Sequence, residues 1–203
     1  MNQQRIRTGN LAAWGLVCAF WLSGASLAAA DLDLYIGLPK KMPEGEWKMY
    51  LGEIGSDTVA SYKLGAEGKP QSTVSIVWMQ ELYNSRAMLE KAAPALKKIL
   101  TTSIHKGSKP DTEKLPPHSS VFGLTGEEKE DSLILFYEFK QAKDSEEHKA
   151  GTYRYYYIFK PVDEKTSISL GVEVQIHDPG HVDSINSLLL ACTIRTPAEV
   201  AAE

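Results

Sequence analysis

Two histidines four residues apart, His177 and His181, are the candidate metal ligands of the sequence, with Asp178 and Asp183 beside them. Imidazoles at positions i and i+4 of a helix can share a zinc ion. Asp178-Pro179, however, is a typical helix start, with Asp as N-cap and Pro at the first helical position. His177 then precedes the helix, no third ligand is evident, and the helix N-terminus disfavours a cation. We expect surface histidines beside a capping Asp, with no metal and no cofactor.

Hydrolytic chemistry finds little support in the residue pattern. The sequence has no G-x-S-x-G, no H-E-x-x-H and no Gly-rich phosphate loop ending in Lys-Ser/Thr. Ser103 and Lys106 match the S-x-x-K of penicillin-binding enzymes, but the companion strings S-D-N and K-T-G are missing. Carboxylates such as Glu81, Glu138 or Glu173 would have to converge in a cleft to act as acid and base. We therefore expect that the protein has no catalytic residue. The alternative is an envelope hydrolase with an unrecognised carboxylate site.

The segment 151–160 is unusually aromatic and supplies the candidate binding residues. Strand alternation places Tyr153, Tyr155 and Tyr157 on one face, and Arg154 and Tyr156 on the other. Rigid aromatic side chains on an exposed sheet face suit contact with a protein or a glycan. These five residues are therefore the candidate binding residues.

The register of this segment against the next strand decides which face is exposed. If the connecting loop is 161–165, Tyr157 lies beside Ser169 and the tyrosines form an exposed ladder over small residues. If the loop is 162–165, Tyr157 meets Leu170 and the ladder belongs to the core. One residue of register exchanges the two faces. Burial of each aromatic side chain contributes about 2 kcal/mol, which favours the core alternative.

The elements that must position these residues follow from hydrophobic periodicity. Strand-like alternation occurs in seven segments, 46–54, 57–64, 72–82, 121–125, 133–140, 152–160 and 166–176. A helical period runs from Ser85 to Leu100, where Asn84 or Ser85 can cap the start, with a kink or break expected at Pro94. A second helix starts at Asp178 and runs to about Cys192. The pattern predicts a single α+β domain over residues 31–197, with an antiparallel sheet of six to seven strands packed with two main helices.

Two segments fall outside these elements. Residues 103–119 form a long irregular connection rich in proline, which at this length is either functional or mobile. The tail, residues 198–203, is expected to be frayed.

The N-terminus is typical of a secretory signal peptide covering residues 1–30. Arg5 and Arg7 precede an apolar run, 11–22, and Ala28-x-Ala30 fits the small-x-small rule for cleavage before Asp31. An uncleaved N-terminal anchor is the alternative. Cleavage near Ala30 predicts a periplasmic or secreted protein that does not span the membrane.

Net charge limits the classes of partner, and the cysteine content excludes an internal disulfide. Without Arg5 and Arg7, the 22 Lys and Arg become 20, against 26 Asp and Glu, so the mature net charge is −6. This acidity argues against nucleic acid as a main partner. Cys192 is the one mature cysteine, so no internal disulfide forms, and its place on an apolar helical stripe predicts a buried side chain.

The order of three strands, a helix, about four strands and a helix, after a lead-in containing Pro39 and Trp47, resembles the PsbP-like superfamily. The resemblance covers roughly residues 35–196 and rests on element order, without a motif. It implies a non-catalytic accessory or binding role and no transferable site residue. Together, these observations predict an exported, non-enzymatic protein that acts on another envelope or secreted protein, as an assembly factor or a toxin-immunity protein. A small-ligand carrier is the second alternative.

Overall fold

The computed structural model describes residues 35–52, 57–80, 82–116, 119–125, 132–145, 148–164 and 166–202. The predicted signal peptide, residues 1–30, and Glu81 lie outside these ranges. Within them, the chain is an α+β structure with a six-stranded antiparallel sheet and two substantial helices. The predicted fold class is confirmed at this level.

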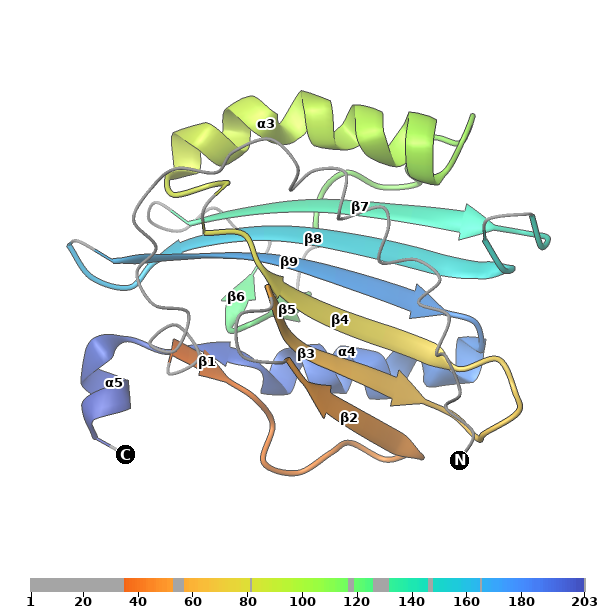
Figure 1. Ribbon diagram of the computed structural model, residues 1–203, viewed down its shortest axis with the longest axis horizontal. Coiled ribbons are helices and arrows are strands. Elements are labelled where there is room, and N and C mark those ends of the chain that lie inside the picture. Colours follow the sequence, from red (N-terminus) through yellow and green to blue (C-terminus); the bar gives the residue numbers. More distant parts are fainter. Residues whose placement is uncertain are drawn as a thin grey trace, which may run out of the picture.

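The central sheet consists of two three-stranded meanders that join side by side. Its strands are β2 (Trp47–Leu51), β3 (Thr58–Leu64), β4 (Ser72–Trp78), β7 (Leu133–Gln141), β8 (Gly151–Pro161) and β9 (Ser167–Ile176). Their order is β2-β3-β4-β9-β8-β7, and each neighbouring pair is antiparallel (Figure 1). The meanders meet where β4 pairs with β9, so β2 and β7 are the two edges.

The first helix, α3 (Arg86–Ile99), begins where the sequence indicates, because the Ser85 side chain accepts a hydrogen bond from the Met88 N–H at 3.3 Å. The helix continues through Pro94, so of the two outcomes predicted there, a kink or a break, the break does not occur. Pro94 and Glu90 are exposed, so water can solvate the carbonyl that a proline nitrogen leaves without a donor. The helix then continues as a π-helical turn, Leu100–Ile104.

The second helix also starts at the predicted cap. The Asp178 side chain accepts a hydrogen bond from the Gly180 N–H at 2.8 Å, and a 3-10 turn, Pro179–His181, leads into α4 (Val182–Ala191). The helix dipole and the cap therefore set this boundary as the Asp-Pro pair predicts.

Two short segments differ from the sequence-based expectation. The predicted strand 121–125 is a small hairpin apart from the main sheet, β5 (Ser120–Val121) with β6 (Leu124–Thr125). The tail predicted to fray instead forms a short helix, α5 (Pro197–Ala201). A capping box between Thr196 and Glu199 satisfies its first backbone N–H groups, which explains why it is helical. Just before it, β10 (Thr193–Ile194) pairs with β1 (Ile36–Gly37).

The sheet separates two apolar cores. One core lies on the face that α4 covers and includes Tyr62, Val74, Ile158, Leu170, Ile185 and Leu189. The other lies on the face that α3 covers, over β7 and β8, and includes Leu89, Leu96, Tyr137, Phe139, Tyr153 and Tyr155. Figure 1 shows α3 along the β7 side of the sheet and α4 away from it. The β8 strand is therefore buried on both faces.

Candidate functional site

The tyrosine ladder of β8 lies inside the protein. Tyr155 is opposite Glu173 and Tyr157 is opposite Gly171, a register two residues beyond the first alternative considered from the sequence. The ladder thus shares a face with the small and polar residues of β9, yet Tyr153, Tyr155 and Tyr157 are only 1 %, 1 % and 4 % exposed. The reason is α3, which packs over this half of the face. The tyrosines are therefore buried, as the core alternative predicts, but the register proposed for it, with Tyr157 opposite Leu170, is wrong. Helix α3 buries the ladder, and strand pairing alone does not reveal that cover.

The other two predicted binding residues lie on the opposite face of β8. Arg154 donates from Nε to Glu138 Oε2 at 2.7 Å and from Nη1 to Asn186 Oδ1 on α4 at 2.9 Å. Tyr156 is 4 % exposed and packs on Phe136, with ring centroids 4.8 Å apart. Burial raises the pKa of Tyr156 to about 12, and Arg154 opposes that rise. All four tyrosines are therefore interior, and the Arg154 side chain is held in an ion pair.

The candidate carboxylates do not converge. Glu138 on β7 lies on the α4 face with Arg154, whereas Glu173 on β9 lies on the α3 face opposite Tyr155. Glu81 lies outside the described residues. Ser103 is in the π-helical turn after α3, whereas an S-x-x-K serine needs a helix N-terminus. Glu138 and Glu173 therefore do not form an acid and base pair on one face of the sheet.

The paired histidines bind protein groups. The Ser72 hydroxyl contacts His181 Nδ1 at 2.9 Å and accepts the His177 N–H at 3.1 Å. His177 Nδ1 contacts the Ala150 carbonyl at 3.0 Å. Within the described ranges, no group of three or more His, Cys, Asp and Glu side chains is placed to hold a metal ion.

A histidine cluster at one end of the tyrosine ladder was not anticipated from the sequence. His105, just after the π-helical turn, is 3 % exposed and bonds through Nε2 to the Tyr155 hydroxyl at 3.0 Å. Its ring stacks between Phe139 and His148, with centroids 4.3 Å and 4.7 Å away. Burial, with a smaller contribution from His148, lowers the pKa of His105 to about 4. His105 is therefore neutral at neutral pH.

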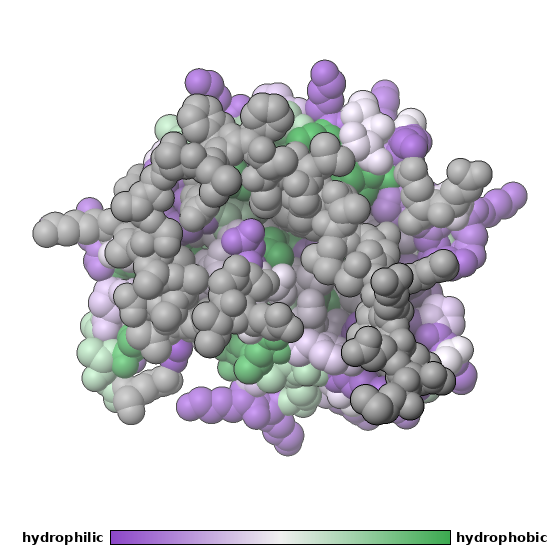
Figure 2. All heavy atoms as spheres, in the orientation of Figure 1, coloured by the Kyte–Doolittle hydropathy of each residue, from purple (hydrophilic) through white to green (hydrophobic). Residues whose placement is uncertain are grey.

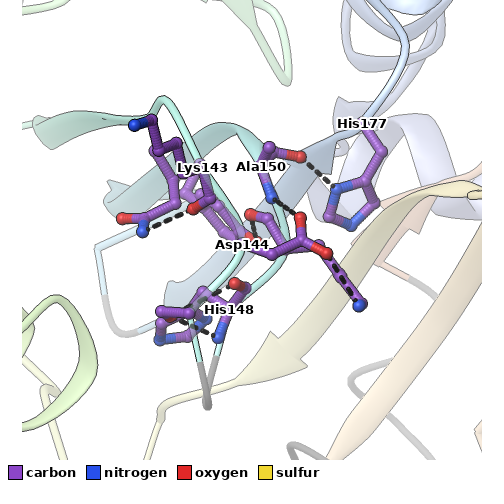
Figure 3. Close-up of polar contacts among 9 residues, drawn as sticks. Lys143, Asp144, His148, Ala150 and His177 are labelled. Atoms are coloured by element: carbon purple, nitrogen blue, oxygen red, sulfur yellow. Dashed lines mark hydrogen bonds and ion pairs between the residues drawn. The ribbon is translucent and has the colours of Figure 1, made fainter.

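The same cluster fastens the loop between β7 and β8. The Asp144 carboxylate accepts from the Ala150 N–H at 2.9 Å, while His177 meets the carbonyl of the same residue (Figure 3). The Tyr153 hydroxyl donates to the Lys149 carbonyl at 2.7 Å, and His148 Nε2 donates to the Ile104 carbonyl. His105, His148 and His177 thus form a structural clamp. The clamp joins the β7–β8 loop, the π-helical turn and the sheet.

A small hollow lies away from this cluster. It has a volume of about 280 Å³ and is lined by Ile36, Gly37, Leu38, Lys40, Ala191, Thr193 and Arg195. Small-ligand sites usually measure about 300–1,000 Å³ and are mostly apolar. The hollow lies just below this size range, and three of its lining residues, Lys40, Thr193 and Arg195, are polar.

The β2 edge is the most exposed apolar feature of the sheet. Among the residues that the structure describes, β2 pairs with β3 alone. Three consecutive side chains on β2 are large and exposed, Met49 at 46 %, Tyr50 at 48 % and Leu51 at 63 %. In Figure 2, hydrophobic residues reach the surface in the lower half of the view, where β2 lies in Figure 1. An exposed apolar edge is a template for pairing with another strand.

Backbone hydrogen bonds show which β2 groups point outward. The Gly65 N–H donates to the Glu46 carbonyl at 3.1 Å, and the Gly52 N–H donates to the Val59 carbonyl at 3.0 Å. In an antiparallel ladder, residues that bond to the partner strand alternate with residues that do not. The backbone N–H and C=O groups of the even-numbered β2 residues therefore point toward β3. The outward N–H and C=O groups belong to Trp47, Met49 and Leu51.

The opposite edge of the sheet is partly covered. Glu138 on β7 donates its N–H to the Thr112 carbonyl at 3.2 Å and accepts from the Asp111 N–H at 2.6 Å. Lys140 pairs with Asp111 at 3.3 Å. The segment around 111–112 thus occupies part of the β7 edge, which leaves β2 as the more accessible edge in the described chain.

Comparison with known proteins adds no relative. No family model, no curated protein and no solved structure matches the chain. In the described part of the chain, no helix combines the length and the apolarity needed to cross a membrane.

Proposed function

We propose that the protein is an exported, non-enzymatic binding protein that acts on another protein of the periplasm or cell envelope by accepting a strand at β2. The observation that carries the proposal is the exposed run Met49–Leu51 on an edge whose outward backbone groups have no described strand beside them. Export rests on the signal peptide that the sequence predicts for residues 1–30.

Strand addition explains how such an edge would bind. An added strand gains main-chain hydrogen bonds to Trp47, Met49 and Leu51, and its alternate side chains pack beside theirs. Full burial of an exposed Met or Leu contributes about 1.5–3 kcal/mol, so two half-exposed side chains supply a moderate share of the binding energy. Affinity would come from the strand as a whole, and an assembly factor or a toxin-immunity protein suits this mode.

The placement of the candidate residues favours binding at β2 over the alternatives. The tyrosines of β8 are buried, so they would support the sheet and would not contact the partner. The separation of Glu138 from Glu173 weighs against a hydrolase that uses these two carboxylates. A non-catalytic accessory role is also what the resemblance to the PsbP-like superfamily implies, which remains part of the proposal.

Affinity capture of tagged mature chain, residues 31–203, from envelope extract tests the proposal. Met49→Pro removes an outward N–H without removing a bond to β3, and edge positions tolerate proline. We expect a near-stoichiometric partner on the wild-type protein and its loss on the Met49→Pro protein. Met49→Ala, which keeps the N–H, is the matched control and should retain most of the partner. Circular dichroism and the melting temperature establish that both variants are folded.

Two results would contradict the proposal. One is capture of nothing at high loading by the wild-type protein. The other is a partner that binds the folded Met49→Pro protein as well as it binds the wild type.

A further inference from the structure

The cross-strand rows at β2 define what an added strand would meet. On the α4 face, Trp47 is opposite Leu64, and Met49 is opposite Tyr62. Leu51, opposite Ala60, completes this apolar side. Since directly opposed side chains are the closest contacts in a sheet, an added strand must present apolar side chains at these three positions.

The other face of the edge carries a like-charge pair. Lys48 is directly opposite Lys63, an arrangement that destabilises a sheet. Glu67 reaches Lys48 at 3.3 Å, but it is 88 % exposed, and such surface pairs contribute little. Lys63 also lies over the Tyr50 ring, 5.3 Å from its centroid. Two cations thus share one row beside the free edge, and an anion placed next to Lys48 would relieve their repulsion.

We infer that the strand accepted by β2 is antiparallel and reads, from its N-terminus, apolar, any residue, apolar, acidic, apolar. This inference rests on the proposed function and names the chemistry of the partner. The three apolar residues face Leu51, Met49 and Trp47 in turn, and the acidic residue faces Lys48. Antiparallel pairing follows from the rest of the sheet, in which each described pair is antiparallel, and from the slightly greater stability of that pairing.

Synthetic peptides test the inference directly. The probe is fluorescein-labelled Ser-Val-Thr-Val-Glu-Val-Ser, and its control carries Lys in place of Glu. Fluorescence anisotropy measures their binding to the mature protein purified after export of the full chain. We expect the Glu peptide to bind at least about fivefold more tightly than the Lys peptide, because a favourable cross-strand ion pair replaces like charges. The difference should shrink at high salt.

A charge exchange isolates the contact with Lys48. In the Lys48→Glu protein the preference should reverse, so that the Lys peptide binds more tightly. This variant places opposite charges across from each other at positions 48 and 63, so it should not weaken the sheet. Met49→Pro should abolish binding of both peptides.

The possible failures are distinct. If both peptides bind equally and Met49→Pro abolishes both, strand addition is correct and the acidic position is wrong. If neither peptide binds while Met49→Pro still abolishes capture of a partner, the residue pattern is wrong. If the purified protein is a dimer that Met49→Pro dissociates, a second copy occupies β2 and the inference is overturned. If binding is indifferent to Met49→Pro, the proposed function itself fails.

Discussion

Acidification should destabilise the protein through His105, the buried imidazole at the end of the tyrosine ladder. His105 is 3 % exposed, stacks on Phe139 and His148, and bonds to the Tyr155 hydroxyl. Its pKa falls from 6.5 to about 4 in the folded protein, chiefly because burial disfavours the charged ring. The unfolded chain therefore binds a proton on this residue between pH 6.5 and pH 4, whereas the folded chain does not.

The sign and the size of the effect follow from proton linkage. The folded state prefers neutral His105, so its stabilising contribution is complete above pH 6.5 and declines as the pH falls toward 4. At 1.36 kcal/mol per pH unit, this interval corresponds to a loss of at most about 3 kcal/mol. For a domain of marginal stability, a loss of this size is a large part of the total.

Urea unfolding at pH 7, 6, 5 and 4 measures this loss. Other titrating groups also contribute, so the informative quantity is the difference between the wild type and a variant without the imidazole. His105→Phe alone would leave the buried Tyr155 hydroxyl without its partner, which costs about 1–3 kcal/mol at every pH. His105→Phe combined with Tyr155→Phe removes both groups and is the better reference.

The free energy of unfolding of the wild type should fall more steeply than that of the double variant, by about 2–3 kcal/mol between pH 7 and pH 4. Parallel pH profiles would refute the reasoning, because they would show that His105 ionises equally in the folded and unfolded states.

Two further changes probe other parts of the structure. Arg154→Met should lower the free energy of unfolding by about 2 kcal/mol, because it leaves the mostly buried Glu138 without its 2.7 Å partner. Adding Glu138→Gln should recover much of the loss, and an unchanged urea midpoint for Arg154→Met would count against the pair. Burial raises the pKa of Cys192 to about 12, so its thiol should be inert to a disulfide reagent at pH 8 and should react once urea unfolds the chain. Rapid labelling of the folded protein would disprove this placement.

The sequence predicts the elements well because their signals are local. The alternation in β9, the Ser85 cap of α3 and the Asp178 cap of α4 each depend on residues within one element, and the structure contains all three. Pro94 is misleading because an exposed helix surface tolerates its missing hydrogen bond.

The candidate sites depend on contacts between residues that are distant in the sequence, and local sequence patterns do not predict such contacts. The burial of Tyr155 depends on α3 covering one half of a sheet face, which strand periodicity does not encode. The clamp joins His105, His148 and His177 from three distant segments. The status of β2 as an edge depends on β9 inserting beside β4, and no local pattern fixes that order. One signal was available, since Met49, Tyr50 and Leu51 are three consecutive large residues on a strand predicted to alternate.

Amide hydrogen exchange across β2, with and without the captured partner, tests strand addition most directly. Lys48 and Tyr50 face β3 and should be protected in both states, whereas the outward amides of Met49 and Leu51 should exchange rapidly in the free protein. The account predicts that partner binding slows exchange at Met49 and Leu51. Slowed exchange elsewhere, with Met49 and Leu51 unchanged, would show that the partner binds a different surface.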